Sequence, residues 1–272
     1  SCAAAAAKAA ATMLLLGHRV SKVTLETPAG ITLELPVENA QGDTSHASCG
    51  VRKDAGDDPD VTHGLLIQAQ VSFIPGEGIV LDGGPGVGRV TQPGLECPVG
   101  QAAINRVPRQ MILDAVADVA APLELSCGLR VLICVPQGEA VAKRTFNPRL
   151  GIVGGISILG TSGIVKPMSE EALAESICLE IRQRAAKGER ELLLAPGNYG
   201  GDFLSHTLGI PMGKAVFFSN FLGQALDCAR QCGILRILLV GHIGKLIKVA
   251  AGVMNTHSHW ADSRLEVLTA HA

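Results

Sequence analysis

Residues 192–198 read Leu-Leu-Leu-Ala-Pro-Gly-Asn, an apolar run that leads directly into a glycine-containing loop. The same order recurs at residues 216–220, Val-Phe-Phe-Ser-Asn, and at residues 237–242, Ile-Leu-Leu-Val-Gly-His. Short, continuous apolar runs are typical of strands that are buried on both faces, as in a parallel sheet. Because helical stretches separate the runs, we expect an α/β, Rossmann-like domain in the C-terminal half.

The loops that follow these runs are the expected ligand-binding part of that domain. In a parallel α/β sheet, ligands bind beyond the carboxyl ends of the strands. Those ends correspond here to residues 196–200, 219–221 and 241–245. Ser169, followed by Glu170 and Glu171, is the expected N-cap of the first helix of this half.

The first half of the chain has a different pattern. An alanine-rich stretch at residues 3–16 predicts a helix that ends at Gly17, since alanine is the best helix former. Alternating apolar and polar residues at 20–27 and 31–37 predict a β-hairpin. Further expected elements are strands at residues 65–73 and 131–135 and a helix opened by Pro108. We therefore expect an α+β N-terminal domain over residues 1–150 and an α/β domain over residues 151–272.

Composition excludes several classes of protein. The 272 residues are 47% apolar and carry a formal net charge of −2, so neither a disordered chain nor a broad basic surface for nucleic acid fits. The sequence has no apolar run of about 18 residues, so a membrane-spanning helix is not expected. Eight scattered cysteines are typical of a reducing compartment, which predicts a cytoplasmic protein. The sequence leaves monomer and homo-oligomer both open.

One loop concentrates acidic residues around a histidine. Residues 53–64 contain four aspartates together with His63, which titrates near neutral pH. Their spacing does not match a calcium-binding EF-hand loop. A solvated turn would explain the cluster, but we favour a substrate-facing acid–base group because His63 is present.

Two segments place cations beside a proline and an asparagine, at residues 103–109 and 143–149. Arginine forks bind carboxylates and phosphates well, so rigidly placed cations indicate a small polyanionic ligand; ordinary surface ion pairing is the alternative. The glycine loop at 83–89 is compatible with an anion-binding loop and with a tight turn. The apolar, glycine-rich stretch at 154–165 fits a wall for a large flat ligand or an interdomain contact. His257 and His259 lack a convincing third partner, so no protein-bound metal is expected.

Three of these stretches resemble signatures of the CbiD family, namely residues 53–64, 147–161 and 241–246. The resemblance extends from Ser1 to Ser258. It implies transfer of a methyl group from S-adenosylmethionine to C1 of cobalt-precorrin-5B, giving cobalt-precorrin-6A in anaerobic cobalamin biosynthesis. The cobalt would then be carried by the tetrapyrrole substrate. A non-catalytic tetrapyrrole-binding or assembly protein of the same pathway is the alternative.

The resemblance also suggests roles for individual residues. The candidate catalytic residues are Asp54, Asp57 and His63. The candidate substrate-binding residues are Arg89, Arg109, Lys143, Arg149 and Thr161. The candidate S-adenosylmethionine-binding residues are Gly197, Asn198, Gly200, Ser219, Asn220, Gly241 and His242.

Overall fold

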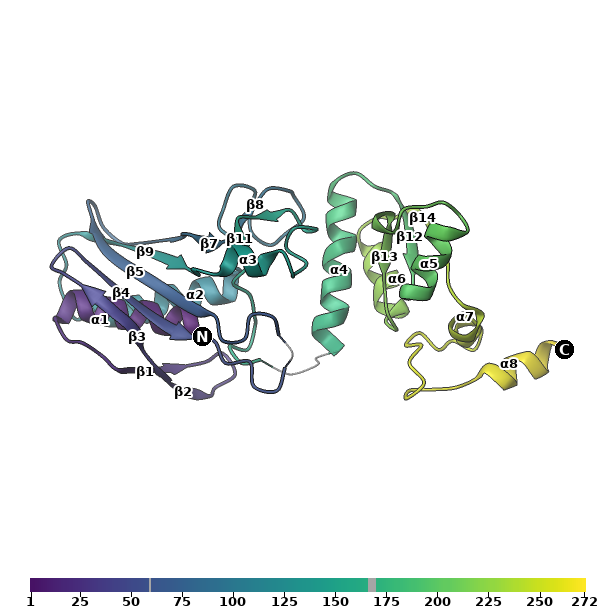
Figure 1. Cartoon of the computed structure of the whole chain (residues 1–272), viewed down its shortest axis with the longest axis horizontal. Coiled ribbons are helices and arrows are strands. Elements are labelled where there is room, and N and C mark those ends of the chain that lie inside the picture. Colours follow the sequence, from purple (N-terminus) through teal and green to yellow (C-terminus); the bar gives the residue numbers. More distant parts are fainter. Residues whose placement is uncertain (59, 166–169) are drawn as a thin grey trace. The chain divides into compact units, whose positions relative to one another are not determined.

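A computed structural model describes residues 1–58, 60–165 and 170–272, with all side chains in these ranges except those of residues 198 and 199. The chain is a mixed α/β protein that divides into two compact units (Figure 1). Unit 1 comprises residues 1–92 and 96–168, and unit 2 comprises residues 93–95 and 169–272.

The division differs from the expected boundary after residue 150. Strand β10 (Ile152–Val153) pairs antiparallel with β8 (Arg89–Val90), and β11 (Gly155–Ile156) pairs in parallel with β7 (Gly86–Val87). These backbone hydrogen bonds attach the segment after residue 150 to unit 1.

Unit 1 is built on a five-stranded sheet. Its strands lie in the order β3 (Glu38–Gly42), β4 (His46–Arg52), β5 (Leu66–Ile74), β9 (Gly128–Cys134) and β6 (Ile79–Gly83). All neighbours are antiparallel except β6 and β9, which are parallel. The expected strands near 65–73 and 131–135 are confirmed as β5 and β9.

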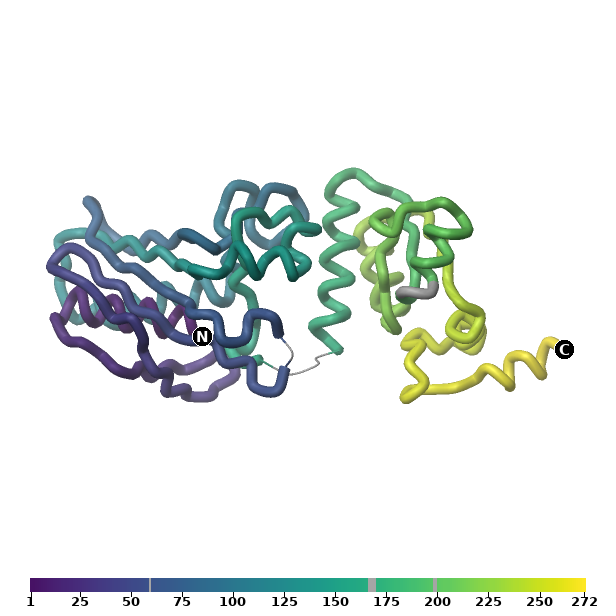
Figure 2. Tube along the Cα trace, viewed as in Figure 1, coloured from purple at the N-terminus to yellow at the C-terminus, as the bar shows by residue number. Residues whose placement is uncertain are grey.

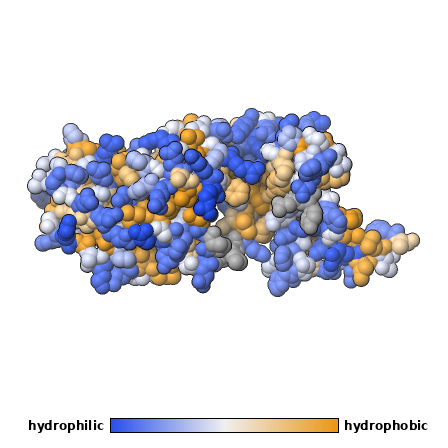
Figure 3. Space-filling view, viewed as in Figure 1, coloured by the Kyte–Doolittle hydropathy of each residue, from blue (hydrophilic) through white to orange (hydrophobic). Residues whose placement is uncertain are grey.

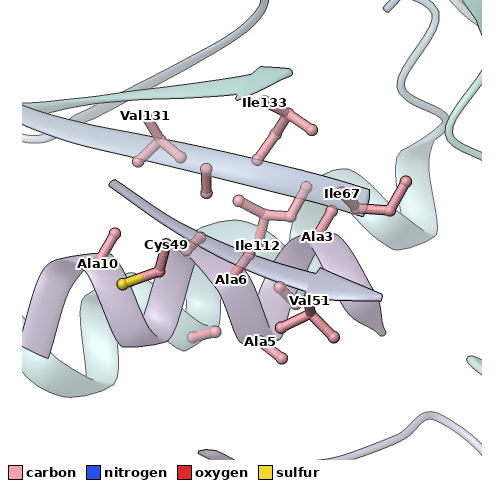
Figure 4. Close-up of a cluster of buried hydrophobic side chains, with 14 of the residues drawn as sticks. Ala3, Ala5, Ala6, Ala10, Cys49, Val51, Ile67, Ile112, Val131 and Ile133 are labelled. Atoms are coloured by element: carbon pink, nitrogen blue, oxygen red, sulfur yellow. The ribbon is translucent and has the colours of Figure 1, made fainter. Parts of the chain in front are cut away.

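A helix of buried alanines forms the centre of unit 1. Helix α1 (Cys2–Leu16) contacts β4, β5, α2 (Arg106–Ala120) and the first strand of the predicted hairpin. Because neighbours lie on several sides, alanine is buried even where the helix turns away from the sheet. Figure 4 shows the labelled alanines of α1 among Cys49, Val51 and Ile67 of the sheet. The buried alanines are Ala3, Ala4, Ala5, Ala6, Ala7, Ala9, Ala10 and Ala11.

The predicted helix and hairpin at the start of the chain are both confirmed. Gly17 ends α1 in a left-handed conformation (φ 68°), where a residue without Cβ is favoured. The hairpin consists of β1 (Lys22–Glu26) and β2 (Thr32–Pro36), paired antiparallel. Helix α2 begins at Arg106, two residues before the expected Pro108.

Three strands of the sheet end at the same edge. Strands β4, β6 and β9 run in one direction, because β5 is antiparallel to both β4 and β9 and β6 is parallel to β9. Their carboxyl ends therefore share an edge, which we call the unit 1 strand-end edge. Figure 1 shows α3 (Gly138–Ala142), β7, β8 and β11 together beyond the sheet at one end.

Unit 2 contains a three-stranded parallel sheet. Its order is β13 (Ala215–Phe217), β12 (Glu191–Ala195) and β14 (Arg236–Leu239), with β12 at the centre. Each of the three predicted apolar runs forms a strand of this parallel sheet. The expected burial on both faces is wrong for β14, where Ile237 and Leu238 are 37% and 56% exposed, because β14 is an edge strand. The expected N-cap, Ser169, lies outside the described residues.

Helices cover both faces of this sheet. Helices α4 (Glu170–Ala186) and α6 (Leu222–Gln231) share a hydrophobic cluster with one face, and α5 (Asn198–His206) packs on the other. Figure 2 traces the remaining path through η1 (Met212–Lys214), α7 (Ile243–Ala250) and α8 (Arg264–His271).

We expect substitution of Ala6 by leucine to destabilise unit 1 by about 1–3 kcal/mol, because Ala6 is fully buried and three extra heavy atoms would overpack the interface. Hydrogen exchange of β4 and β5 peptides as a function of urea would measure this unit-specific free energy. Ala172→Leu, at an exposed position in α4, is the matched control and should change stability by no more than about 0.5 kcal/mol. Equal stability of both variants would contradict the packing described here.

Candidate functional site

The acidic loop of unit 1 is held by an ion pair near its base. The Lys53 ammonium pairs with the Asp60 carboxylate and also donates to Thr62 Oγ1 at 2.6 Å. Burial raises the pKa of Asp60, but hydrogen bonds from Lys53 and Thr62 outweigh it, so that the pKa lies below its usual value. Asp60 is therefore an ionised structural residue of this loop.

The structure brings Asp54 and His63 together. Asp54 Oδ1 lies 3.9 Å from His63 Nδ1, and both side chains are exposed. His63 Nδ1 accepts a hydrogen bond from the Ala55 backbone N–H at 3.1 Å, which places the proton of the neutral ring on Nε2. Asp54 Oδ1 in turn accepts from the Gly56 N–H at 2.8 Å. Asp57 is exposed and makes no hydrogen bond or ion pair with any described residue.

Three glycines bring the other loops of the strand-end edge into backbone contact. A Cβ on Gly86 would overlap Val135 O, and a Cβ on Gly138 or Gly155 would overlap Gly86 O. Gly86 also has a φ of 77°, which disfavours any L side chain. The glycine loop is therefore a close-packed junction between the segments that follow β6 and β9.

The segment from residue 143 to 159 exposes cations and apolar side chains together, and we call it the basic–apolar segment. It is folded around buried Asn147, whose Nδ2 donates to Gly155 O at 3.2 Å and whose Oδ1 accepts from Ser157 Oγ at 3.2 Å. Phe146, Val153 and Leu159 are 60%, 59% and 69% exposed. Lys143, Arg144 and Arg149 are also exposed, and none of them forms an ion pair within the described ranges.

Surface of this mixed kind is visible over unit 1. Figure 3 shows hydrophobic and hydrophilic residues interleaved on the face in view. A depression of about 180 Å³ also lies at the strand-end edge, lined by Arg52, Leu66, Pro136 and Gln137. Ligand pockets usually enclose about 300–1,000 Å³, so this depression is too small for a large ring. Such a ring would instead lie against the exposed surface of the basic–apolar segment.

The remaining candidate substrate residues have separate environments. Arg89 donates to Asp82 Oδ2 at 2.7 Å and to the carbonyls of Gly83 and Gly100, so its charge is already paired. That pairing lowers the pKa of Asp82. Arg109 is half-buried and donates to Leu81 O at 3.4 Å. Thr161 is exposed.

In unit 2 the chain reverses direction around the central strand. After β12 it crosses through α5 to β13 on one side, and after β13 it crosses through α6 to β14 on the other. The carboxyl ends of β12 and β14 therefore form a topological switch point, where α/β sheets bind ligands. A Cβ on Gly241 would lie 2.9 Å from Pro196 Cδ, and one on Gly200 would lie 3.2 Å from Val240 O. The two loops are thus in direct contact.

Other predicted residues lie at the same edge of the sheet. Gly197 has nothing within 4 Å of its Cβ position, so there is open space beside its backbone. His242 is the N-cap of α7, and its Nδ1 accepts from the Gly244 N–H at 3.0 Å. Ser219 follows β13 with a positive φ of 53°. Asn198 begins α5, but its side chain lies outside the described part of the structure.

Lys245 lies within the expected ligand-binding loop at residues 241–245, but the sequence predicts no role for its side chain. Its Nζ donates to Asn220 Oδ1 at 2.8 Å and to Ser219 O at 3.3 Å, so it joins α7 to the loop after β13. The sequence does contain one indication of a role for Lys245, which is its position in the first turn of a helix that follows a strand. A cation is unfavourable there because of the helix dipole, so its presence points to a function. Lys53 and Asn147 lie in stretches that the sequence singles out, but their roles depend on contacts that sequence spacing does not show.

No three His, Cys, Asp or Glu side chains within residues 1–58, 60–165 and 170–272 gather in a group able to hold a metal ion. In the same part of the chain, no helix has the length and apolar character needed to cross a bilayer.

Comparison with known proteins identifies the family. The CbiD family model matches residues 1–167. The chain is 50% identical over 272 residues to the cobalt-precorrin-5B C(1)-methyltransferase of Ruminiclostridium cellulolyticum, covering all of this chain and 71% of that protein. It is 51% identical over 271 residues to the protein of the same name from a Thermoanaerobacter species, covering 100% of this chain and 73% of that protein.

A solved structure also matches, that of the cobalamin biosynthesis protein CbiD from Archaeoglobus fulgidus. It is 29% identical with a TM-score of 0.49, and the match covers 97% of this chain and 81% of that chain. The family assignment depends on the family model and the relatives at about 50% identity, both of which extend over most of the chain. This chain belongs to the CbiD family.

Proposed function

We propose that this chain transfers a methyl group from S-adenosylmethionine to C1 of cobalt-precorrin-5B, giving cobalt-precorrin-6A in anaerobic cobalamin biosynthesis. The observation that carries this proposal is identity of about 50% over the whole chain with enzymes of that name.

The basic–apolar segment supports binding of the tetrapyrrole by unit 1. Such a substrate is a large, partly apolar ring with carboxylates at its rim. Phe146, Val153 and Leu159 offer apolar surface to a ring, and Lys143 and Arg149 offer cations that no acid of the described chain neutralises. Arg89 is a weaker candidate for binding substrate carboxylates, because its guanidinium already forms an ion pair with Asp82.

The switch point supports binding of the methyl donor by unit 2, which we propose to be a Rossmann-like donor site. Gly200 and Gly241 hold the two loops in contact, and the open space beside Gly197 leaves room for a ligand against the backbone. When bound, S-adenosylmethionine supplies a methyl group attached to a sulfonium sulfur. When the methyl group is transferred, the sulfur keeps the bonding electron pair and S-adenosylhomocysteine leaves as a neutral thioether. The task of the protein is then to align the reacting carbon, the methyl group and the sulfur.

The acidic loop supplies the groups that could remove a proton from the methylated ring. We propose Asp57 as the base, because its carboxylate has no partner within the described residues. Asp54 is the second candidate and already accepts the Gly56 N–H. The Nδ1 lone pair of His63 is occupied by the Ala55 N–H, so the neutral ring presents Nε2–H to solvent as a hydrogen-bond donor. His63 would then orient substrate rather than accept its proton.

Methyl transfer distinguishes this function from a non-catalytic tetrapyrrole carrier. With methyl-labelled S-adenosylmethionine and cobalt-precorrin-5B under anaerobic conditions, we expect one label per ring and release of S-adenosylhomocysteine. A carrier would bind the ring without consuming the donor, and that outcome would contradict the proposal.

Substitution of Lys143 and Arg149 together by glutamine should weaken binding of the tetrapyrrole by about tenfold or more, because two charge-assisted contacts to carboxylates are lost. Absorbance titration with the ring would measure the Kd. A double variant of Lys22 and Arg130 to glutamine removes the same charge elsewhere in unit 1 and is the control. Equal affinity of the two variants would exclude the basic–apolar segment as the tetrapyrrole site.

Asp57→Asn should lower kcat by about 100-fold or more with little change in KM, since it removes a general base but no binding contact. Asp118→Asn, at an exposed position of α2, should leave both constants unchanged. Single-turnover methyl transfer would separate chemistry from product release. Unchanged turnover in Asp57→Asn and in Asp54→Asn would show that neither carboxylate is the base.

Asp60→Asn should destabilise the acidic loop by about 1–3 kcal/mol at pH 7, because it leaves the half-buried Lys53 ammonium without its anion. The folded-state pKa of Asp60 is lowered, so its stabilisation is present above the unfolded pKa and is lost as pH falls through the folded pKa. The difference between variant and wild type should therefore shrink only below about pH 4. Urea-dependent hydrogen exchange of residues 53–65 would measure this difference in the free energy of unfolding. A difference that does not depend on pH would contradict the structural role of the Asp60 carboxylate.

A further inference from the structure

Lys245 reaches across the end of the central strand of unit 2. It lies in the first turn of α7, which follows β14, yet its Nζ contacts Ser219 O and Asn220 Oδ1, which follow β13. Strands β13 and β14 lie on opposite sides of β12. The side chain of Lys245 therefore spans the carboxyl end of β12, where the loop beginning at Pro196 starts.

Neither lysine of α7 pairs with an acid among the residues that the structure describes. The acceptors of Lys245 are one carbonyl and one amide oxygen. Lys248 is 3% exposed and donates only to the carbonyls of Thr256 and Ala261, at 3.3 and 3.1 Å. No carboxylate of residues 1–58, 60–165 or 170–272 pairs with either ammonium. The charge of Lys248 contributes to the lowered pKa of Asp262, but the Asp262 carboxylate is paired with Arg264.

The two lysines leave positive charge at the strand ends that no carboxylate of the described residues neutralises, and the desolvation cost falls mainly on the buried Lys248. A charge removed from water is expensive when its partners are neutral. Burial lowers the pKa of Lys245, and the charge of Lys248 lowers it further. The position in the first turn of a helix adds an unfavourable dipole. An ammonium has three N–H donors and two are used here, so one remains for a ligand.

We propose that Lys245 binds the amino-acid carboxylate of the methyl donor. This inference rests on the proposed function, because it takes the donor to be S-adenosylmethionine bound at the unit 2 strand ends. The carboxylate is the one anionic group of that molecule, whose sulfonium and ammonium are both cationic. Lys245 would thus fix the methionine end of the donor at the end of β12, with the adenosine part held by other contacts.

The test compares two ligands that differ in the amino-acid part. S-adenosylhomocysteine carries the carboxylate, and 5′-deoxy-5′-methylthioadenosine lacks the whole amino-acid portion. Lys245→Gln keeps an N–H donor toward Asn220 but removes the charge. By isothermal titration, this variant should bind S-adenosylhomocysteine about tenfold or more weakly, with the Kd for methylthioadenosine changed less than about twofold.

The control is Lys214→Gln, since Lys214 directly precedes β13 and so lies at the opposite edge of the same sheet. Its affinity for both ligands should equal that of the wild type. A wild-type comparison needs no substitution: decarboxylated S-adenosylmethionine should bind about tenfold or more weakly than S-adenosylmethionine itself.

Each other outcome has a definite meaning. Equal losses for both ligands in Lys245→Gln would make the residue a structural link between α7 and the loop after β13, and would overturn the inference. Unchanged binding of both ligands, or a loss confined to tetrapyrrole binding, would overturn it as well. Failure of the wild type to bind either nucleoside would instead contradict the proposed function, so the two failures can be distinguished.

Discussion

The contact of backbone with backbone at Gly86 determines how unit 1 presents its strand ends. Val135 O occupies the position that a side chain on Gly86 would need, and Gly86 O occupies the positions needed at Gly138 and Gly155. Three chain segments can meet there only because none of them carries a Cβ. Gly138 lies just before the basic–apolar segment and Gly155 lies within it, so the junction attaches this segment to the glycine loop after β6 at two points.

Unit 2 uses the same physical device with different residues. Gly241 against Pro196, and Gly200 against Val240, close the loops after β14 and β12 onto each other. Lys245 then joins the third strand end to this pair through Asn220. In both units, glycines let one chain segment approach another closely, and positive charge comes from a few cations that have no acidic partner in the described part of the chain. A chain with a formal net charge of −2 can in this way offer local positive sites for anionic ligands.

The elements that could be predicted are those whose pattern is local. The apolar run of β12 and the alanines of α1 are visible in the sequence because each extends over a whole element. Strand β4 was not predicted, because its inward residues, Ala47, Cys49 and Val51, are small enough to face α1 and give only a weak alternation. The acidic loop and the glycine loops were identified as candidates. No local pattern encodes tertiary contacts such as the ion pair of Arg89 with Asp82 and the hydrogen bond of Lys245 to Asn220.

Hydrogen exchange measured with each ligand in turn distinguishes the two proposed sites, the strand ends of unit 2 for the methyl donor and the basic–apolar segment of unit 1 for the tetrapyrrole. S-adenosylhomocysteine should protect peptides that cover residues 196–201 and 241–246. The tetrapyrrole should protect peptides that cover residues 143–161. Protection of unit 1 peptides by S-adenosylhomocysteine, with residues 196–201 and 241–246 unchanged, would contradict the account.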